Sequence, residues 1–384
     1  MKSKRMKFIA LFILVSLFAT MLPLNIYAQF ESLAGSAVLI EASTGQVLYE
    51  KNSEVSMPPA SITKVMTLLL GFEAVSKGTA KWDDLVSISE NAWRMEGSKM
   101  FLEVGSKVSY RDIIKGISIV SANDGCVALA EHLSGSERAF VSVMNQRAKE
   151  LGMTNSTFKN STGLPEEGHT LSAKDIATLS LHLIQNYPEI LEIESTTEFT
   201  FNNIRQFNRN PLLGVYDGAD GLKTGWTEDA GYCLAATAIQ NDIRLIAVIL
   251  NTKSESERKT ASQELLTYGF KNFKVLEYKK AGEIVDNINV SNGKKASVQL
   301  KLDKDIKVIV PINREKDIQT VVVKSTPSLN APVTIGVSAG KFEVKLDDNI
   351  LASSGVSTTE SIEKSGFFKW VFDGLRSFFS KLGK

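Results

Sequence analysis

The feature that most constrains the fold is a long helical stretch enclosed by strand-like segments at both of its ends. Residues 36–51 alternate apolar and polar side chains around Ser43-Thr44-Gly45, which predicts a β-hairpin. The expected helices cover residues 60–77, 110–133, 136–151, 172–186 and 255–273, and the expected later strands cover residues 221–224, 232–238 and 244–250. We therefore expect one domain whose sheet combines N-terminal and C-terminal strands around an inserted helical subdomain.

The pattern changes at about residue 278. Short alternating runs such as 306–312 are separated by turns that contain Ser-Asn-Gly, Asp-Lys-Asp or proline. We predict a small all-β domain over residues 278–352, followed by a polar tether over residues 353–365. The preceding domain accordingly covers residues 29–277.

The composition excludes several functional classes. The 384 residues carry 44 Lys and Arg against 43 Asp and Glu, and a net charge of +1 provides no electrostatic footprint for nucleic acid. Two cysteines cannot supply a disulfide framework or a four-thiolate zinc site, and the histidines at 132, 169 and 182 are scattered. We expect no nucleic-acid partner, no metal and no cofactor.

Both ends of the chain indicate export and a membrane surface. Four cations within residues 1–7 precede an apolar run from Phe8 to about Leu24, which is typical of a secretory signal peptide over residues 1–28. An uncleaved anchor is the alternative, and either one places the rest of the chain outside the cytosol.

The C-terminal segment 366–384 has the pattern of an amphipathic helix. Its five phenylalanines share an arc of about 140° with its aliphatic residues, while four cations and one anion occupy the remainder. Such a helix is too short and too charged to span a bilayer, but it suits the interface. We expect it to hold the protein at the outer face of the cytoplasmic membrane, with packing on its own domain as the alternative.

A nucleophile is predicted in Ser61-Ile62-Thr63-Lys64, at the start of a helix that Pro59 opens. A spacing of three residues places the Ser61 hydroxyl and the Lys64 amine on one helical face. The next residues, 65–72, are apolar on nearly all sides, so we expect the helix to be buried and the amine to be desolvated. Desolvation lowers the pKa of a lysine and allows its neutral amine to act as a base.

Two further motifs strengthen a Ser-x-x-Lys pattern that is common by itself. Ser121-Ala122-Asn123 interrupts an apolar helical region, where polar side chains need partners. Lys223-Thr224-Gly225 occurs once in the chain, and we expect it to end a strand at which Gly225 lets a substrate backbone approach closely.

In their order and spacing, the three motifs resemble those of the penicillin-recognising serine hydrolases. The surrounding segments are similar to the low-molecular-weight penicillin-binding proteins, the D-alanyl-D-alanine carboxypeptidases; they read PPASITKVMT, SANDGCVALAEHLSGSE, ELGMTNSTFKNSTGL and DGLKTGWTEDAGYCLAATA. The resemblance covers residues 33–275 and implies an α/β (α+β) penicillin-binding/β-lactamase-like catalytic domain with an antiparallel sheet. The signal peptide, the trailing β domain and the amphipathic end also fit this family.

The resemblance implies a hydrolase that removes the terminal D-alanine from peptidoglycan stem pentapeptides and is also acylated by β-lactam antibiotics. Ser61 would attack the penultimate D-Ala carbonyl while Lys64 takes its proton. Ser121 would relay a proton to the leaving amine, and Asn123 would orient Lys64 and the substrate amide.

The same resemblance implies a pocket for the free C-terminal carboxylate. Lys223 would sustain a positive field, and Thr224 and Arg258 would bind the carboxylate. The backbone N–H groups of Ser61 and Trp226 would form the oxyanion hole. A cationic pocket for a free C-terminus favours a carboxypeptidase over an enzyme that cleaves internal bonds.

A difference from the class A β-lactamases, and three residues near the motifs, lead to further expectations. A class A β-lactamase needs a Glu-x-x-Leu-Asn segment, whereas the corresponding stretch contains Glu166 and Glu167 without that pattern, so a penicillin adduct should be released slowly. Cys126 and Cys233 are expected to be buried free thiols, with a disulfide as the alternative. We expect His169 to be a plain loop histidine, with a position bordering the site as the alternative.

Two other functions share this evidence. A D,D-endopeptidase acting on peptidoglycan cross-links would use the same catalytic residues. A catalytically silent penicillin-binding wall protein would keep the fold, but the three intact motifs argue against it.

Overall fold

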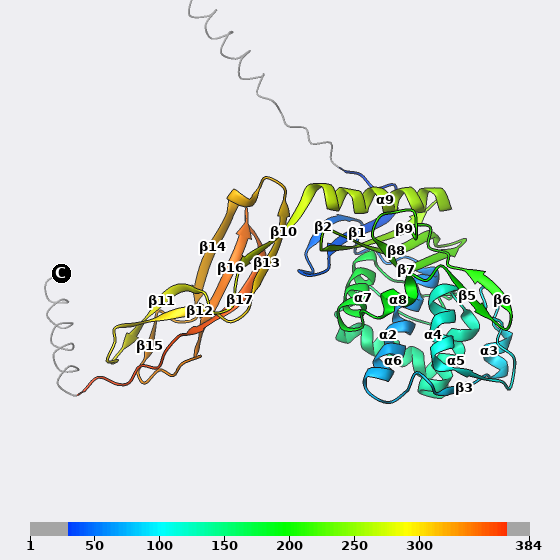
Figure 1. Cartoon of the computed structure of the whole chain (residues 1–384), viewed down its shortest axis with the longest axis horizontal. Helices are drawn as coiled ribbons and strands as arrows, with labels where there is room; N and C mark the ends of the chain where they lie inside the picture. Colours follow the sequence, from blue (N-terminus) through cyan, green and yellow to red (C-terminus); the bar gives the residue numbers. More distant parts are fainter. Residues whose placement is uncertain (1–29, 367–384) are drawn as a thin grey trace, which may run out of the picture. The chain divides into compact units, whose positions relative to one another are not determined.

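The computed structural model describes residues 30–366. Its first region, residues 33–272, is built on a five-stranded antiparallel sheet in the order β2-β1-β9-β8-β7, with α9 on one face and the other helices on the opposite face (Figure 1). The strands are β1 Ser36–Glu41, β2 Val47–Lys51, β7 Ala219–Thr227, β8 Gly231–Gln240 and β9 Ile243–Thr252. The N-terminal hairpin thus pairs with a C-terminal strand, which confirms the predicted fold class.

Most of the helices between and after these strands follow the predicted periods. They are η1 Ala60–Thr63, α2 Lys64–Ser76, α3 Glu90–Arg94, α4 Tyr110–Ile119, α5 Asn123–Ser134, α6 Glu137–Glu150, α7 Ala173–Asn186, α8 Ile190–Glu194 and α9 Glu255–Asn272. The helix α2 is buried along its first eleven residues, since its sequence is apolar on nearly every side. The single region expected over 110–133 is divided into α4 and α5 at Ser121, which has a φ of 63°.

Serine side chains mark where several of these helices begin. In each case the serine hydroxyl accepts a hydrogen bond from the backbone N–H three residues later, which satisfies a donor that the helix itself leaves free. The capping residues are Ser89, Ser109, Ser136, Ser172 and Ser254. The sequence patterns did not predict α3, α8 or two small two-stranded sheets, which pair β3 Leu85–Ser87 with β4 Lys107–Ser109 and β5 Glu198–Phe201 with β6 Ile204–Phe207.

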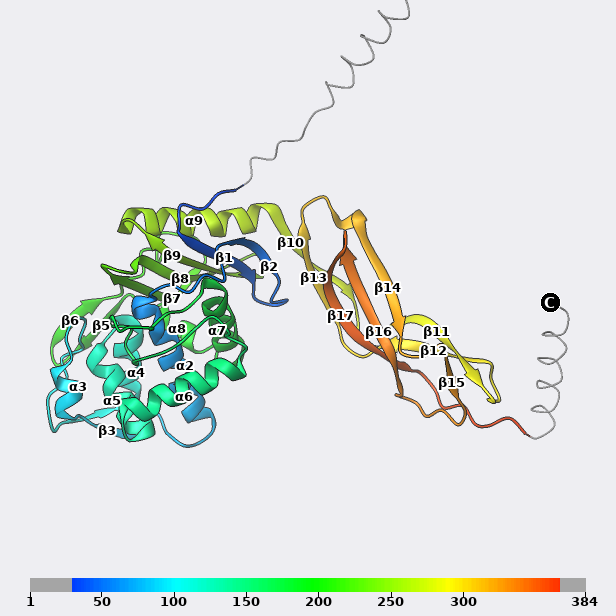
Figure 2. The same ribbon diagram turned by 180° about the vertical axis from the view of Figure 1, so that it is seen from behind.

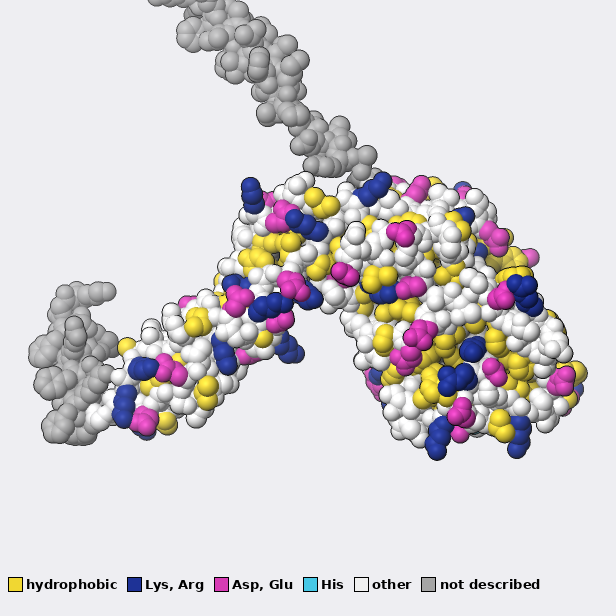
Figure 3. Space-filling model, viewed as in Figure 1, with side chains coloured by type: hydrophobic (Ala, Val, Ile, Leu, Met, Phe, Trp, Pro, Cys, Tyr) yellow, Lys and Arg dark blue, Asp and Glu magenta, His cyan; other side chains and the backbone are white. Residues whose placement is uncertain are grey.

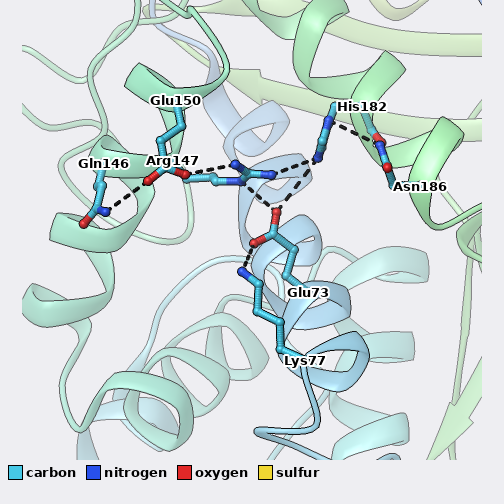
Figure 4. Close-up of polar contacts among 7 residues, drawn as sticks. All are labelled: Glu73, Lys77, Gln146, Arg147, Glu150, His182 and Asn186. Atoms are coloured by element: carbon cyan, nitrogen blue, oxygen red, sulfur yellow. Dashed lines mark hydrogen bonds and ion pairs between the residues drawn. The ribbon is translucent and has the colours of Figure 1, made fainter.

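A charged cluster joins the C-terminal end of α2 to α6 and α7 (Figure 4). The buried carboxylate of Glu73 accepts hydrogen bonds from Lys77 at 2.6 Å and from Arg147 at 2.7 Å. Arg147 also donates to Glu150 at 2.9 Å and to Nε2 of His182 at 3.0 Å. Arginine can only donate, so Nε2 of His182 accepts here and the ring is neutral. Burial, and to a smaller degree the charge of Arg147, lowers the pKa of His182.

The second region, residues 273–366, is all β and has its own apolar core, which includes Val308, Phe342 and Val356. Figure 2 shows its strands from behind. The strands are β10 Phe273–Lys279, β11 Ile284–Ser291, β12 Ser297–Leu302, β13 Ile306–Pro311, β14 Ile318–Lys324, β15 Ser328–Asn330, β16 Ser338–Leu346 and β17 Asn349–Thr358. Six of them form a sheet in the order β14-β16-β17-β12-β11-β15, and β10 pairs with β13.

The predicted boundaries of this region need two corrections. It begins at Phe273 and not at residue 278, because β10 pairs with β13 along nearly its whole length. The tether predicted over residues 353–365 is wrong, since β17 runs to Thr358 and pairs with β12 and β16. Ile362 and Lys364 then form single bridges to Val333 and Gly293. The polar residues that suggested a tether alternate with buried ones in a paired strand.

The predicted signal peptide, residues 1–28, lies outside the described residues, as does nearly all of the predicted amphipathic helix, residues 366–384. Between residues 30 and 366, no helix combines the length and the apolar character that crossing a membrane requires.

Candidate active site

The three motifs meet in one cleft of about 1220 Å³ in the first region. Seven of the nine predicted site residues line this cleft: Ser61, Ser121, Asn123, Thr224, Gly225, Trp226 and Arg258. The other two, Lys64 and Lys223, lie beneath it and are 0% and 2% exposed. The structure therefore brings together all of the residues that the sequence singled out.

The first motif places a buried amine against the serine hydroxyl. Ser61 lies in η1 and Lys64 begins α2, so the turn between the two helices orients both side chains. Nζ of Lys64 lies 2.9 Å from Oγ of Ser61, 2.7 Å from Oδ1 of Asn123 and 2.6 Å from the carbonyl oxygen of Thr162. Burial lowers the pKa of Lys64 to about 8, with a smaller opposing contribution from Cys126. The amine is within proton-transfer distance of Ser61 and close to the pKa that a general base needs.

The second motif forms the break between α4 and α5. Ser121 takes the left-handed backbone conformation that non-glycine residues rarely adopt, and it faces the cleft. Asn123 is fixed at three points: its Oδ1 accepts from Lys64, its Nδ2 donates to the carbonyl oxygen of Glu96 at 2.7 Å, and its backbone N–H donates to the carbonyl oxygen of Ser98 at 2.7 Å. Asn123 therefore holds Lys64 in a defined position.

The third motif lies within β7 and not at its end, which corrects the prediction. Residues 223–225 fall in the middle of the strand, which is the edge strand of its sheet. Gly225 lines the cleft, and the structure gives a second reason for a glycine at this position. A Cβ atom there would lie 3.0 Å from the carbonyl oxygen of Pro59 and 3.1 Å from the backbone nitrogen of Ser61. Gly225 therefore makes room for the turn that carries the nucleophile.

Cationic groups surround the motifs. Nζ of Lys223 donates to the carbonyl oxygen of Thr224 at 3.1 Å, and burial is the main cause that lowers its pKa, with the charge of Lys64 acting in the same direction. The Arg258 guanidinium lies over the ring of Tyr232 at 5.6 Å, and burial lowers its pKa. Its Nε is buried and has no hydrogen-bond partner among residues 30–366. The cleft thus offers positive charge that the protein leaves only partly compensated.

Sequence reasoning missed two cations that line the cleft, Arg209 and Lys259. Nη1 of Arg209 donates to Oγ of Ser98 at 2.7 Å, which holds it beside the second motif. Arg209 belongs to no recognisable pattern and reaches the cleft only through the path of its loop. Lys259 directly follows Arg258, and this adjacency was the one available signal.

The predictions for the two cysteines and for His169 have different outcomes. Cys126 and Cys233 are free and buried as predicted, and burial raises their thiol pKa values to about 12 and about 11. His169 is not a plain loop histidine, because it is buried with Nε2 2.9 Å from Oγ1 of Thr63. It lines a second cavity of about 370 Å³ that shares Gly163, Leu164 and Thr227 with the cleft, so it lies beside the site and does not line the cleft itself. Burial, aided by nearby lysines, lowers its pKa to about 4.

No group of three or more His, Cys, Asp and Glu side chains suited to a metal ion occurs within residues 30–366. The chemistry of the cleft is that of a hydroxyl, a buried amine and surrounding donors, which together suit acyl transfer.

Comparison with known proteins identifies the class. The family model of D-alanyl-D-alanine carboxypeptidase matches residues 25–254, and the model of the penicillin-binding protein 5 C-terminal domain matches residues 270–364. The D-alanyl-D-alanine carboxypeptidase DacF of Bacillus subtilis is 39% identical over 349 residues, which cover 88% of each chain. The chain belongs to the D-alanyl-D-alanine carboxypeptidase family, the low-molecular-weight penicillin-binding proteins.

Solved structures agree. Penicillin-binding protein 5 of Haemophilus influenzae superposes with a TM-score of 0.81 and is 34% identical, covering 87% of this chain and 99% of its own. Penicillin-binding protein D2 of Listeria monocytogenes, solved in an ampicillin-bound form, superposes with a TM-score of 0.58 and is 33% identical, covering 63% of this chain and 99% of its own.

Proposed function

We propose that this protein is a serine-type D-Ala-D-Ala carboxypeptidase that removes the terminal D-alanine from peptidoglycan stem pentapeptides and is also acylated by penicillins. The observation that carries the proposal is the contact between Nζ of Lys64 and Oγ of Ser61 at 2.9 Å, with the amine buried and its pKa lowered to about 8. A neutral lysine in this position can remove the serine proton as the hydroxyl attacks.

In the acylation step, Oγ of Ser61 forms a bond to the carbonyl carbon of the penultimate D-alanine while Lys64 takes the hydroxyl proton. The backbone N–H groups of Ser61 and Trp226 stabilise the negative charge on the carbonyl oxygen. The tetrahedral intermediate then collapses, the C–N bond breaks, and Ser121 relays a proton to the departing D-alanine amine. Water hydrolyses the ester in the second half of the reaction and regenerates Ser61.

The preference for a free C-terminus follows from the charge of the cleft. Arg209, Arg258 and Lys259 line it, and Lys223 lies beneath it. Glu228 and Glu255 also line the cleft and offset part of this charge, with Glu255 3.8 Å from Arg258. A substrate carboxylate would be paired with the cations and with the hydroxyl of Thr224, whereas an internal peptide bond would supply no negative charge. This favours removal of a terminal residue.

The experiment is incubation of the full chain, in mild detergent, with a peptide that ends in D-Ala-D-Ala, followed by measurement of released D-alanine. We expect release by the wild type, abolition in Ser61→Ala, and a penicillin adduct on Ser61 detected by mass spectrometry. Ser142→Ala is the matched control because this exposed serine on α6 lies outside the cleft.

Three outcomes would contradict the proposal. Release that persists in Ser61→Ala assigns the reaction to another residue. Penicillin labelling without any peptide turnover indicates a catalytically silent penicillin-binding protein. Faster cleavage of cross-linked than of uncross-linked muropeptides indicates a D,D-endopeptidase.

We also infer that the protein is exported and bound peripherally to the outer face of the cytoplasmic membrane. The support is the sequence alone: the signal-like residues 1–28 and the amphipathic pattern of residues 366–384. Deletion of residues 367–384 should move the protein to the soluble extracytoplasmic fraction and leave kcat on a small peptide unchanged. Retention in the membrane fraction would contradict the anchoring role.

A further inference from the structure

A buried carboxyl group lies behind the Lys-Thr-Gly strand and belongs to none of the motifs. Glu194, the last residue of α8, is 1% exposed, and its Oε2 has no hydrogen-bond partner within the described part of the chain. Oγ of Ser118 on α4, a helix that packs against α8, is also buried without a hydrogen bond of good geometry, although it is near enough to Glu194 to lower the pKa of the carboxyl. Burial of a carboxyl oxygen without a full hydrogen bond costs stability, so its presence here indicates a use.

The backbone places this carboxyl beside β7. A Cβ atom on Gly221 would lie 3.4 Å from Cβ of Glu194, so the end of α8 packs directly against this point of the strand. Two amides from one loop contact the two elements: Nδ2 of Asn208 donates to the carbonyl oxygen of Glu194 on α8 at 2.9 Å, and Nδ2 of Asn210 donates to that of Gly221 on β7 at 3.0 Å.

Lys223 leaves β7 on the same face of the strand. Side chains alternate along a strand, so Gly221, Lys223 and Gly225 share one side. Gly221 faces α8 and Gly225 faces the turn that carries Ser61. The Lys223 side chain therefore starts between Glu194 and the nucleophile. It is 2% exposed, and its one hydrogen bond goes to a neutral carbonyl oxygen.

We propose that Glu194 is a positioning residue for Lys223: its carboxylate supplies the negative charge that keeps the Lys223 amine protonated and directed at the cleft. The inference rests on the proposed function, in which the positive charge of Lys223 assists binding and acylation.

Burial disfavours the charge of both groups, and each charge stabilises the other against it. Burial raises the pKa of Glu194, and the charge of Lys223 opposes that shift; burial lowers the pKa of Lys223, and the charge of Glu194 opposes that one. Two other cations, Lys64 on α2 and Arg209 in the lining of the cleft, lower the pKa of Lys223. The weakly acidic thiol of Cys126 on α5 raises it by a smaller amount. Within residues 30–366, Glu194 is therefore the one carboxylate among the groups that shift the pKa of Lys223.

The experiment compares pH profiles of kcat/KM for D-alanine release and of the second-order rate of penicillin acylation. Loss of the Lys223 proton should end activity at alkaline pH. Glu194→Gln keeps the shape of the side chain but removes its charge, so the pKa of Lys223 should fall. The alkaline limb of both pH profiles should then move to lower pH by about one unit, and at a given pH on that limb the variant should be roughly tenfold slower than the wild type. Glu194→Asp keeps the charge at a greater distance and should show a smaller shift in the same direction.

The control is Glu192→Gln, an exposed carboxylate on the same helix, which should leave both profiles unchanged. A reduction of equal size at every pH, with the limb unmoved, would mean that Glu194 is only structural and would overturn the inference. If Glu194→Gln does not fold, an unmoved limb in Glu194→Asp has the same meaning. If the wild type is acylated but releases no D-alanine, the proposed function fails while the acylation profile still tests Glu194.

Discussion

The two regions of the chain differ in how deeply they bury charged side chains. Residues 33–272 bury eight of them: Glu41, Lys64, Glu73, Asp124, Asp175, Glu194, Lys223 and Arg258. Within residues 273–366 no Lys, Arg, Asp or Glu is buried, and the charged side chains form pairs at the surface, such as Lys294 with Glu363. Figure 3 shows positive and negative side chains next to one another along this region.

A matched pair of contacts makes the difference concrete. Arg244 and Asp220 in the first region form two hydrogen bonds of 2.8 Å, and Arg314 and Asp347 in the second form two of 3.1 and 3.0 Å. The side chains of the first pair are 17% and 22% exposed, whereas those of the second are 41% and 62% exposed. The geometry is similar, but water screens the pair in the first region less, because its side chains are more deeply buried.

Removal of the buried charge at Lys64 should produce the largest effect. Lys64→Met keeps the length of the side chain but cannot accept a proton, so acylation should fall by about 10²–10⁴-fold. The midpoint of thermal unfolding should change little. Removal of a buried charge stabilises the folded state, and this offsets the destabilisation from the loss of three hydrogen bonds. The measurements are penicillin acylation and calorimetry.

Lys341→Met, at an exposed position on β16, is the control for this substitution and should be neutral in both measurements. Acylation within tenfold of the wild type in Lys64→Met would show that another group acts as the base.

A cavity in the second region should affect stability and not catalysis. Phe342 is buried in the β core, and Phe342→Ala should lower the free energy of unfolding of this region by about 3–5 kcal/mol. At 25 °C, kcat on a small peptide should be unchanged, because the cleft is built from residues 61–259 alone. Ile350→Ala, at an exposed site, is the matched control for thermal unfolding. A parallel loss of kcat would mean that the regions are coupled.

The pH dependence should reflect the lowered pKa of Lys64. The residue must be neutral to act as a base, so below its pKa of about 8 kcat/KM should fall tenfold for each pH unit. Folding lowers this pKa from 10.5, so the unfolded chain binds more protons between pH 8 and 10.5, and the contribution of Lys64 to stability rises across that window. A rate that is flat between pH 5 and 8 would rule out Lys64 as the titrating group.

The two arginine–aspartate pairs should give the smallest effect. A double-mutant cycle with Arg244→Ala and Asp220→Ala should give a coupling of about 1–3 kcal/mol that persists in high salt. The corresponding cycle for Arg314 and Asp347 should give a smaller coupling that salt removes. Equal couplings would contradict the idea that burial distinguishes the two regions.

Much of the site could be predicted because its chemistry depends on local spacing. Ser61 and Lys64 are one helical turn apart, and the apolar residues after them predicted the burial that lowers the pKa of the lysine. The order of strands and helices likewise predicted the sheet. The tether over residues 353–365 was predicted wrongly, because the polar sequence of β17 resembles that of a linker until its two partners β12 and β16, which flank it within the sheet, are known.

The sequence by itself determined the candidate nucleophile Ser61, its candidate base Lys64 and the fold class, since each rests on residues close together in the chain or on periodicity. Only the tertiary structure decided what surrounds them. Arg209 and Glu194 come from segments without a motif, and Gly225 serves the turn at Pro59, which is more than 160 residues away. The electrostatic field at a site sums over charges that are near in space, and periodicity along the chain carries no information about which distant segments will meet there.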